Sequence, residues 1–471
     1  MCPVVLLALI LSVILLLLEV TAALSVTFRP SQVKQLKEDQ LIDVSFNLNT
    51  SINKFNTRNN YYEIYIDDQS IVEVVGNKTL NLDNNLHQNY TFELRGKSLG
   101  HSWLEVVNKN NTDDRSERLA ISVIRPSSRL TKIFTICVAV LISINYINMG
   151  CALDLNVVLQ VIKRPIAPII GFVCQYGFMP LMAYIVGKVL LRESYLQLGL
   201  FVFGASPGGG ASNMWTVLCG GNLNLSITMT FISTLSAIFM MPLWLFTLGR
   251  NIFEGTTTTV PLHNIFGSLA SMTIFLGVGL LFQRFIPRVA NICRKILAPV
   301  SIAMIIFIVI FGTYANLYMF RLMSWRILLS ASINVWSGFL IGLLASILLK
   351  QSSVNQIAIA IETGIQNTGV AIVLLGLSLP QPDADLASVI PVAASVMTPI
   401  PLTIVYIIIK VKNCLNKESK VNLNSGALDD SIVNECLNPN KTISSTLPLN
   451  GDNKNLQKYT YDQINWTNGN I

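Results

Sequence analysis

Charged residues and histidines are scarce in this sequence. Asp, Glu, Lys and Arg make up only 13% of the 471 residues, against about 25% in an ordinary soluble domain. The three histidines, His87, His101 and His263, lie far apart along the chain. A zinc site or a Ser-His-Asp triad is therefore disfavoured, and the apolar part of the chain offers no nucleophile–base pair. These absences indicate that the chain is not an enzyme.

Cysteine is missing from the front of the chain. All eight cysteines lie outside Leu24 to Leu130, and no two of them form a CxxC pair. This excludes a disulfide framework in the front region and a CxxC metal site. The net charge of +7 comes without an interleaved basic and aromatic pattern, so nucleic acid is not an expected partner. No cofactor is expected either.

The front of the chain predicts an exported β-domain. The apolar run Val4 to Leu18 is followed by Thr21-Ala22-Ala23, which is typical of a signal peptide (residues 1–23); a retained membrane helix is the alternative. Residues 24–128 alternate short β-branched or aromatic segments with Asn, Asp and Gly clusters, which predicts a small all-β, Ig-like extracellular domain. Its four glycosylation sequons begin at Asn49, Asn77, Asn89 and Asn110.

Residues 129–411 predict an all-α, multi-pass membrane domain with nine transmembrane helices. A cleaved signal peptide puts the N-terminus outside, and an excess of Lys and Arg in the loops expected inside agrees. We expect a plasma-membrane protein in contact with the lipid bilayer, with a disordered cytoplasmic tail at 412–471. The helices are expected near Lys132–Ala152, Pro165–Leu190, Tyr195–Cys219, Asn224–Gly249, Pro261–Phe282, Ile292–Ala315, Ile327–Leu349, Val354–Leu379 and Ser388–Lys410.

Two polar, glycine-containing segments interrupt these apolar helices. The first runs from Ser206 to Asn213 as SPGGGASN, and the second from Glu362 to Asn367 as ETGIQN. Helix breaks at membrane depth persist only where they line a protein-enclosed cavity. A carboxylate there is costly, and no Lys or Arg lies at the same depth to pair with Glu362. Paired interruptions of this kind point to the binding site of a secondary transporter.

Sodium prefers oxygen ligands with one compensating charge, and the segments around these breaks supply them. Ser226 and Thr230 are four residues apart, so their hydroxyls share one helix face. Either hydroxyl alone could instead bond the carbonyl one turn back, and the glycines could serve only close helix packing. The other candidate oxygens belong to Gln175 inside the second span, to Ser212 and Asn213, and to Glu362 and Gln366.

At these residues the chain resembles the bile acid:sodium symporter family, over roughly Arg129 to Lys412. A signal peptide and an extracellular β-domain before nine spans further resemble the P3-protein-like branch of that family. The resemblance rests on Met149-Gly150 with Leu153, Gln175 to Pro180, Ser206 to Gly209 with Ser212-Asn213, Asn224-Leu225-Ser226 with Ser233-Thr234, and Glu362 to Asn367, in this order.

The resemblance implies a panel of helices packed on a core of inverted repeats, in which two broken helices cross. It implies a first sodium site at Ser212, Asn213, Ser226, Thr230 and Glu362. It implies a second site at Gln175, Glu362, Gln366 and the carbonyls of Thr363 and Ile365. Substrate is expected beside the crossing, near Asn213, Asn367 and Gly210, although Gly210 stands where transporting members often carry a polar residue.

The leading hypothesis is therefore sodium-coupled import of an amphipathic organic anion, such as a bile acid or sterol conjugate, by alternating access. The partners would be sodium ions, which are transported rather than held as a cofactor, and the organic anion itself. The alternative is a non-transporting membrane glycoprotein that acts through its ectodomain as a receptor or adhesion module.

Overall fold

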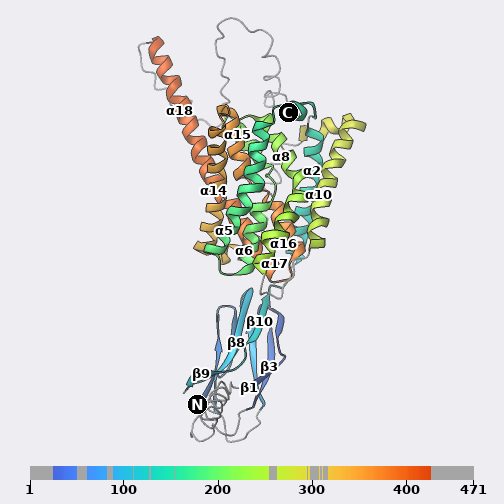
Figure 1. The fold of residues 1–471 in the computed structure, drawn as a ribbon. Helices are drawn as coiled ribbons and strands as arrows, with labels where there is room; N and C mark the ends of the chain where they lie inside the picture. The colour runs from blue at the N-terminus through green and yellow to red at the C-terminus, as the bar shows by residue number, and fades with distance from the viewer. Residues whose placement is uncertain are drawn as a thin grey trace, which may run out of the picture. The chain divides into compact units, whose positions relative to one another are not determined.

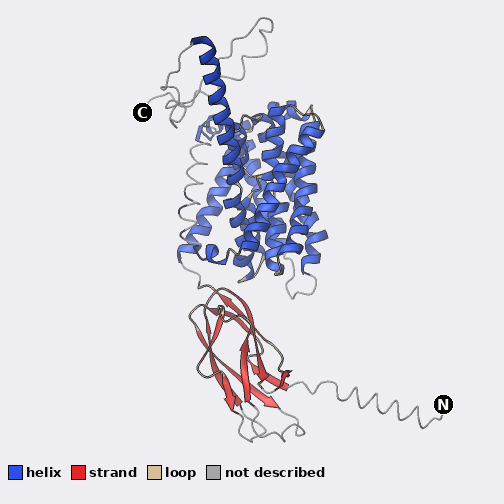
Figure 2. Cartoon of the chain, turned by 90° about the vertical axis from the view of Figure 1, so that its left-hand side faces the viewer, coloured by secondary structure: helices blue, strands red, loops and turns tan. Residues whose placement is uncertain are grey.

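The computed structural model describes residues 25–49, 61–81, 89–109, 111–126, 129–153, 155–253, 262–293 and 317–425, with 295–296, 307, 310 and 314. Several sequence predictions lie outside these residues. They concern the signal peptide, the sequon at Asn110, most of the sixth expected span and the tail beyond Ser425. Strands occupy the front of the chain and helices the rest (Figure 2).

The front part consists of two β-sheets. One sheet has the strand order β1-β3-β7-β5, and the other has the order β2-β10-β8-β4-β6 with β9 beside β8. Strand β10 pairs in parallel with β2 and antiparallel with β8. The strands are β1 (Ser25–Arg29), β2 (Val33–Lys37), β3 (Leu41–Asn49), β4 (Tyr61–Ile66), β5 (Val72–Val75), β6 (Thr79–Asn81), β7 (Asn89–Gly96), β8 (Gly100–Asn108), β9 (Asn111–Arg115) and β10 (Leu119–Ile124).

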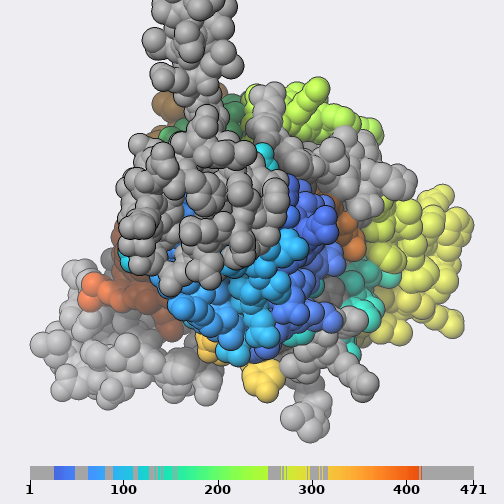
Figure 3. Space-filling view, turned by 90° about the horizontal axis from the view of Figure 1, so that it is seen from below, coloured from blue at the N-terminus to red at the C-terminus, as the bar shows by residue number. Residues whose placement is uncertain are grey.

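Alternating side chains from both sheets form one hydrophobic core. Val44 and Leu94 from the first sheet belong to the same buried cluster as Leu104 and Ile121 from the second. The period of two that buries every second residue is visible in β10, where Leu119, Ile121 and Val123 are buried. The expected all-β domain is confirmed as two packed sheets, and its Ig-like assignment stays a prediction. Its described residues form a continuous blue surface in Figure 3.

The remainder of the described chain is helical (Figure 1). Two π-helical turns, η2 and η3, interrupt the α-helices. The elements are α2 (Arg129–Ala152), α3 (Leu155–Ile162), α4 (Ile166–Val173), η2 (Cys174–Phe178), α5 (Met179–Leu190), α6 (Ser194–Ala205), α7 (Ala211–Leu218), α8 (Leu223–Trp244), η3 (Leu245–Gly249), α9 (Arg250–Phe253), α10 (Leu262–Phe285), α13 (Leu317–Leu322), α14 (Trp325–Leu348), α15 (Ser353–Gly364), α16 (Thr368–Ser378), α17 (Asp383–Met397) and α18 (Pro399–Ser425).

Four helical segments of the described chain are long and apolar enough to cross a membrane. They are Ile166–Leu190, Leu223–Ile252, Trp325–Leu348 and Asp383–Lys412. The expected spans Tyr195–Cys219 and Val354–Leu379 are each divided into two short helices, α6 with α7 and α15 with α16. The prediction of a break in each is confirmed. The total of nine spans stays a prediction.

Two boundaries in the structure differ from those expected from sequence. The last span begins at Asp383 rather than Ser388, because the two acidic residues of its first turn, Asp383 and Asp385, suit a helix N-terminus. Helix α18 also continues to Ser425, into the region expected to be a disordered tail. The polar residues after Lys412 include good helix formers, and the first Gly or Pro after them is Gly426.

Candidate functional site

The break between α6 and α7 follows from Pro207 and the glycines after it. Proline restricts the preceding residue to an extended conformation, and Ser206 adopts it with φ −69° and ψ 157°. The break between α15 and α16 follows Gly364, and Ile365 is likewise extended. Each break thus exposes a short stretch of backbone that no helix satisfies.

The two breaks satisfy each other. The N–H of Gly209 donates to the carbonyl of Ile365 at 2.9 Å, and the N–H of Asn367 donates to the carbonyl of Pro207 at 2.8 Å. Gly208 and Gln366 form an isolated antiparallel bridge between these bonds. A Cβ on Gly209 would stand 2.7 Å from the Gln366 carbonyl oxygen, so only glycine allows this approach. The expected crossing of the two broken helices is therefore present.

Three hydroxyls surround the carboxylate of Glu362 beside the crossing. Ser212 on α7 and Ser226 on α8 both donate to Oε2, the second at 3.0 Å, and Thr230 donates to Oε1 at 2.7 Å. Glu362 is only 3% exposed, and all three hydroxyl residues are buried as well. Asn213 joins this group, since Ser226 Oγ lies 2.9 Å from its Oδ1. The structure thus brings together all five residues expected at the first sodium site.

This cluster consists of hydroxyls, one amide and one carboxylate, and it contains no cationic side chain. The hydroxyl of Ser226 faces both Glu362 Oε2 and Asn213 Oδ1, while that of Thr230 faces both Glu362 Oε1 and the Ser226 carbonyl at 3.0 Å. Each hydroxyl proton has an acceptor, and the Ser226 carbonyl also accepts the helical N–H of Thr230 within α8. None of the ion pairs in the described part of the chain involves Glu362. The arrangement lacks positive charge, which a monovalent cation would supply.

Gln175 is positioned by a local irregularity in its helix. Pro180 has no N–H, so the carbonyl of Tyr176, four residues earlier, lacks its helical donor. The indole N–H of Trp244 donates to that carbonyl at 2.7 Å, and Tyr176 lies in the π-helical turn η2. Such turns are frequent at functional sites. Gln175 belongs to this turn and is only 3% exposed.

Gln175 and Gln366 connect the second group of expected ligands. Gln175 Nε2 donates to Gln366 Oε1 at 2.6 Å, and Gln366 Nε2 donates to the carbonyl of Thr363 at 3.0 Å. The carbonyl of Ile365 already accepts from Gly209, and a carbonyl oxygen can accept twice. Among the described residues, Gln175 Oε1 is buried without a hydrogen-bond partner. An oxygen of this kind is a ready cation ligand.

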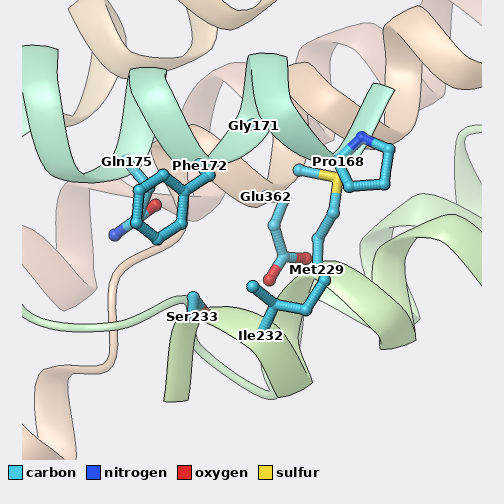
Figure 4. A pocket seen from close by; sticks show the side chains of 8 residues that line it. All are labelled: Pro168, Gly171, Phe172, Gln175, Met229, Ile232, Ser233 and Glu362. Carbon is cyan, nitrogen blue, oxygen red and sulfur yellow. The ribbon is translucent and has the colours of Figure 1, made fainter. Parts of the chain in front are cut away.

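A small cavity of about 10 Å³ separates Gln175 from Glu362. A space of this size holds roughly one water-sized sphere. Figure 4 shows Glu362 among the lining side chains, with Gln175 on one side and Met229 on the other. Ser233 also lines the cavity, and its hydroxyl accepts the N–H of Gly208 at 3.2 Å. Gln175 and Glu362 thus border one small space, whose other lining residues are mostly apolar.

The residues expected near substrate are more accessible than the ion ligands. Gly210 is exposed, and Asn213 and Asn367 are partly exposed. Asn367 also begins α16, because its Oδ1 accepts the N–H of Val370 at 3.1 Å. The three residues lie on the two arms of the crossing rather than inside it. Asn213 would thus belong both to the ion ligands and to the residues near substrate.

Sequence reasoning missed two polar residues of the site. Thr216 is fully buried, and its Oγ1 lies 3.3 Å from Ser226 Oγ. Its spacing of four from Ser212 could have revealed it, since both lie on one face of α7. Tyr146 of α2 accepts a hydrogen bond from Asn367 Nδ2 at 2.9 Å. No local pattern in the sequence of α2 distinguishes it.

Comparison with known proteins gives this geometry a context. The model of the sodium bile acid symporter family matches residues 138–323. The hepatic sodium/bile acid cotransporter of Rattus norvegicus is 30% identical over 254 residues, which cover 53% of this chain and 69% of that protein. The chain belongs to the sodium bile acid symporter family. As a member, it is an integral membrane protein of a transporter family, which fits the expectation that it is not an enzyme.

Two further members of the family are similar to this chain. The P3 protein of Homo sapiens is 30% identical over 251 residues, which cover 53% of each chain. The ileal sodium/bile acid cotransporter of Oryctolagus cuniculus is 27% identical over 281 residues, 58% of this chain and 80% of that protein. The chain therefore spans about half the length of the P3 proteins that it matches.

Proposed function

We propose that this symporter-family member couples the entry of sodium to the import of an amphipathic organic anion. The observation that carries the proposal is Glu362, a buried carboxylate that accepts from three hydroxyls and forms no ion pair in the described part of the chain. An uncompensated charge at membrane depth is expensive, so a protein retains it for an ion. The relatives named as sodium/bile acid cotransporters also support sodium-coupled transport.

The first ion would bind Ser212, Asn213, Ser226, Thr230 and Glu362. The second would bind Glu362, Gln175, Gln366 and the carbonyls of Thr363 and Ile365. Each ion would then join residues from different helices across the crossing. Substrate would bind beside it, near Asn213, Asn367 and Gly210. A bile acid or a sterol conjugate is the substrate class that we propose.

Sodium would act by shifting a population between two arrangements of the carrier. An ion favours a state only through a difference in affinity between the two states. Binding at Glu362 would hold α7, α8 and α15 together and so favour the arrangement that accepts substrate. We propose a plasma-membrane location with the β-domain outside and α18 reaching the cytosol. A receptor that acted through its ectodomain alone would have no use for the uncompensated Glu362.

Uptake by cells that express the full chain tests this function. Labelled taurocholate and estrone sulfate would be offered in sodium medium and in choline medium. We expect sodium-dependent uptake of at least one probe, and a rise in the melting temperature of the purified protein with sodium but not choline. Absence of both effects would rule out the proposed coupling.

A further inference from the structure

The side chain of Tyr146 connects two parts of the helical region. It belongs to α2, and its hydroxyl oxygen accepts the hydrogen bond from Asn367 Nδ2, 221 positions further along the chain. Tyr146 is only 4% exposed, whereas Asn367 is partly exposed. The bond therefore lies at the inner edge of the proposed substrate site and not on the surface.

Helix α2 packs against α10, which lies beside it in Figure 1. A Cβ on Gly150 of α2 would stand 2.9 Å from the Cα of Gly279 of α10, and one on Gly279 would stand 2.8 Å from the Cα of Gly150. Backbones this close leave no room for the two helices to slide past each other. The Tyr146 hydroxyl therefore connects the closely packed pair α2 and α10 to Asn367 at the start of α16.

The residue before Tyr146 on α2 reaches the other arm of the crossing. The amide nitrogen of Asn145 is the nearest atom to the position of a Cβ on Gly210, at 3.8 Å. Asn145 and Tyr146 thus face Gly210 and Asn367, the two residues that we place beside substrate. In this structure α2 occupies the space next to both arms. A substrate that occupied the same space would displace it.

We propose that Tyr146 is a latch that substrate displaces: its hydroxyl holds the Asn367 donor until an oxygen of the substrate takes its place. This inference rests on the proposed transport function. Since Asn367 Nδ2 is a donor, the displacing group must be an acceptor. A carboxylate, sulfonate or sulfate oxygen accepts a bond about twice as strong as a neutral oxygen does. The freed Asn367 donor therefore favours oxyanions over neutral sterols.

A latch in the empty carrier lowers the apparent affinity of every substrate by the same factor, because only the unlatched fraction can bind. Replacing Tyr146 with Phe removes the acceptor and keeps the ring. We expect Tyr146→Phe to lower the KM of taurocholate and of estrone sulfate by a common factor of roughly three to ten, the size of one net hydrogen bond. The maximal rate should change less than KM.

The matched control is Tyr184→Phe. Tyr184 lies on α5 with its ring edge against Phe201, and we expect this variant to keep the KM of the unmodified chain. An unchanged KM in Tyr146→Phe would overturn the latch. A raised KM would also overturn it, because Tyr146 would then be a direct ligand of substrate.

A second measurement needs no substrate and so separates the latch from the transport function. Thr368 follows Asn367 and is partly buried. Thr368→Cys would be labelled with a small methanethiosulfonate reagent, with the chain lacking this cysteine as background. We expect labelling at least about three times faster when Tyr146 is Phe, since the latch no longer holds α2 over α16. Equal rates overturn the latch even if no probe is transported; faster labelling without uptake would leave the latch standing and contradict only the transport function.

Discussion

Ser226 Oγ and Glu362 Oε2 lie 3.0 Å apart, although 136 positions separate the two residues in the chain. The contact joins α8 to the end of α15 at the point where the second helix break begins. Buried apolar residues of the same two helices, Leu225 and Met229 of α8 with Ala358 and Ile359 of α15, form one hydrophobic cluster. This single contact defines the centre of the proposed ion site.

Removal of the charge on Glu362 should abolish sodium dependence. In Glu362→Gln the side chain keeps its size but loses the negative charge that would balance a cation. We expect sodium-dependent uptake of taurocholate to fall to background while surface biotinylation stays normal. The matched control is Glu193→Gln, since Glu193 is exposed before α6. Sodium-dependent uptake that survives in Glu362→Gln would refute the ion site.

The hydroxyl of Thr230 should set the affinity for sodium. It contacts Glu362 Oε1 at 2.7 Å, whereas the hydroxyl of Thr228 on the same helix bonds only the Asn224 carbonyl at 2.8 Å. A hydrogen bond to a charged group contributes about 1.5–3 kcal/mol, which corresponds to roughly tenfold or more in affinity. We therefore expect Thr230→Val to raise the sodium concentration for half-maximal uptake at least about tenfold.

Thr228→Val is the control for this change. It replaces the same hydroxyl by a methyl group on the same helix, at a residue whose hydroxyl bonds the Asn224 carbonyl instead of Glu362. The sodium concentration for half-maximal uptake should stay unchanged in this variant. An equal shift in both variants would show that the effect comes from the packing of α8 and not from an ion ligand.

The sequence predicted the two helix breaks and the shared face of Ser226 and Thr230 better than the boundaries and the neighbours of the site. Pro207 and the glycines after it act locally, and the spacing of Ser226 and Thr230 fixes their common face, so both features could be derived from the chain. The contact between Tyr146 and Asn367 depends on how α2 packs against a distant helix. The start of α17 depends on acidic residues that an apolar-run criterion treats as loop. No local pattern carries either.

The glycines of the first break should differ sharply in their tolerance of a methyl group. A Cβ on Gly209 would meet the Gln366 carbonyl oxygen at 2.7 Å, whereas one on Gly210 would meet nothing nearer than Asn145 at 3.8 Å. Overpacking of this kind costs about 1–3 kcal/mol. We expect Gly209→Ala to lower the melting temperature and abolish uptake, and Gly210→Ala to keep the melting temperature. Similar melting temperatures for the two variants would contradict the crossing geometry.

Gln175 should report on the second ion. Its Oε1 lies buried without a partner among the described residues, and its side chain lines the cavity that also contacts Glu362. If two sodium ions bind together, the sodium dependence of uptake is sigmoidal with a Hill coefficient above about 1. Loss of the second site in Gln175→Ala should lower that coefficient toward 1 while sodium still stimulates uptake through Ser212, Ser226 and Thr230.

Gln197→Ala on α6 is the matched control. The Oε1 of Gln197 is also buried without a partner in the described part of the chain, and its Nε2 bonds the Leu191 carbonyl instead of Gln366. A fall in the coefficient in both variants would point to a general effect of losing a buried amide, and an unchanged coefficient in Gln175→Ala would remove Gln175 from the ion site.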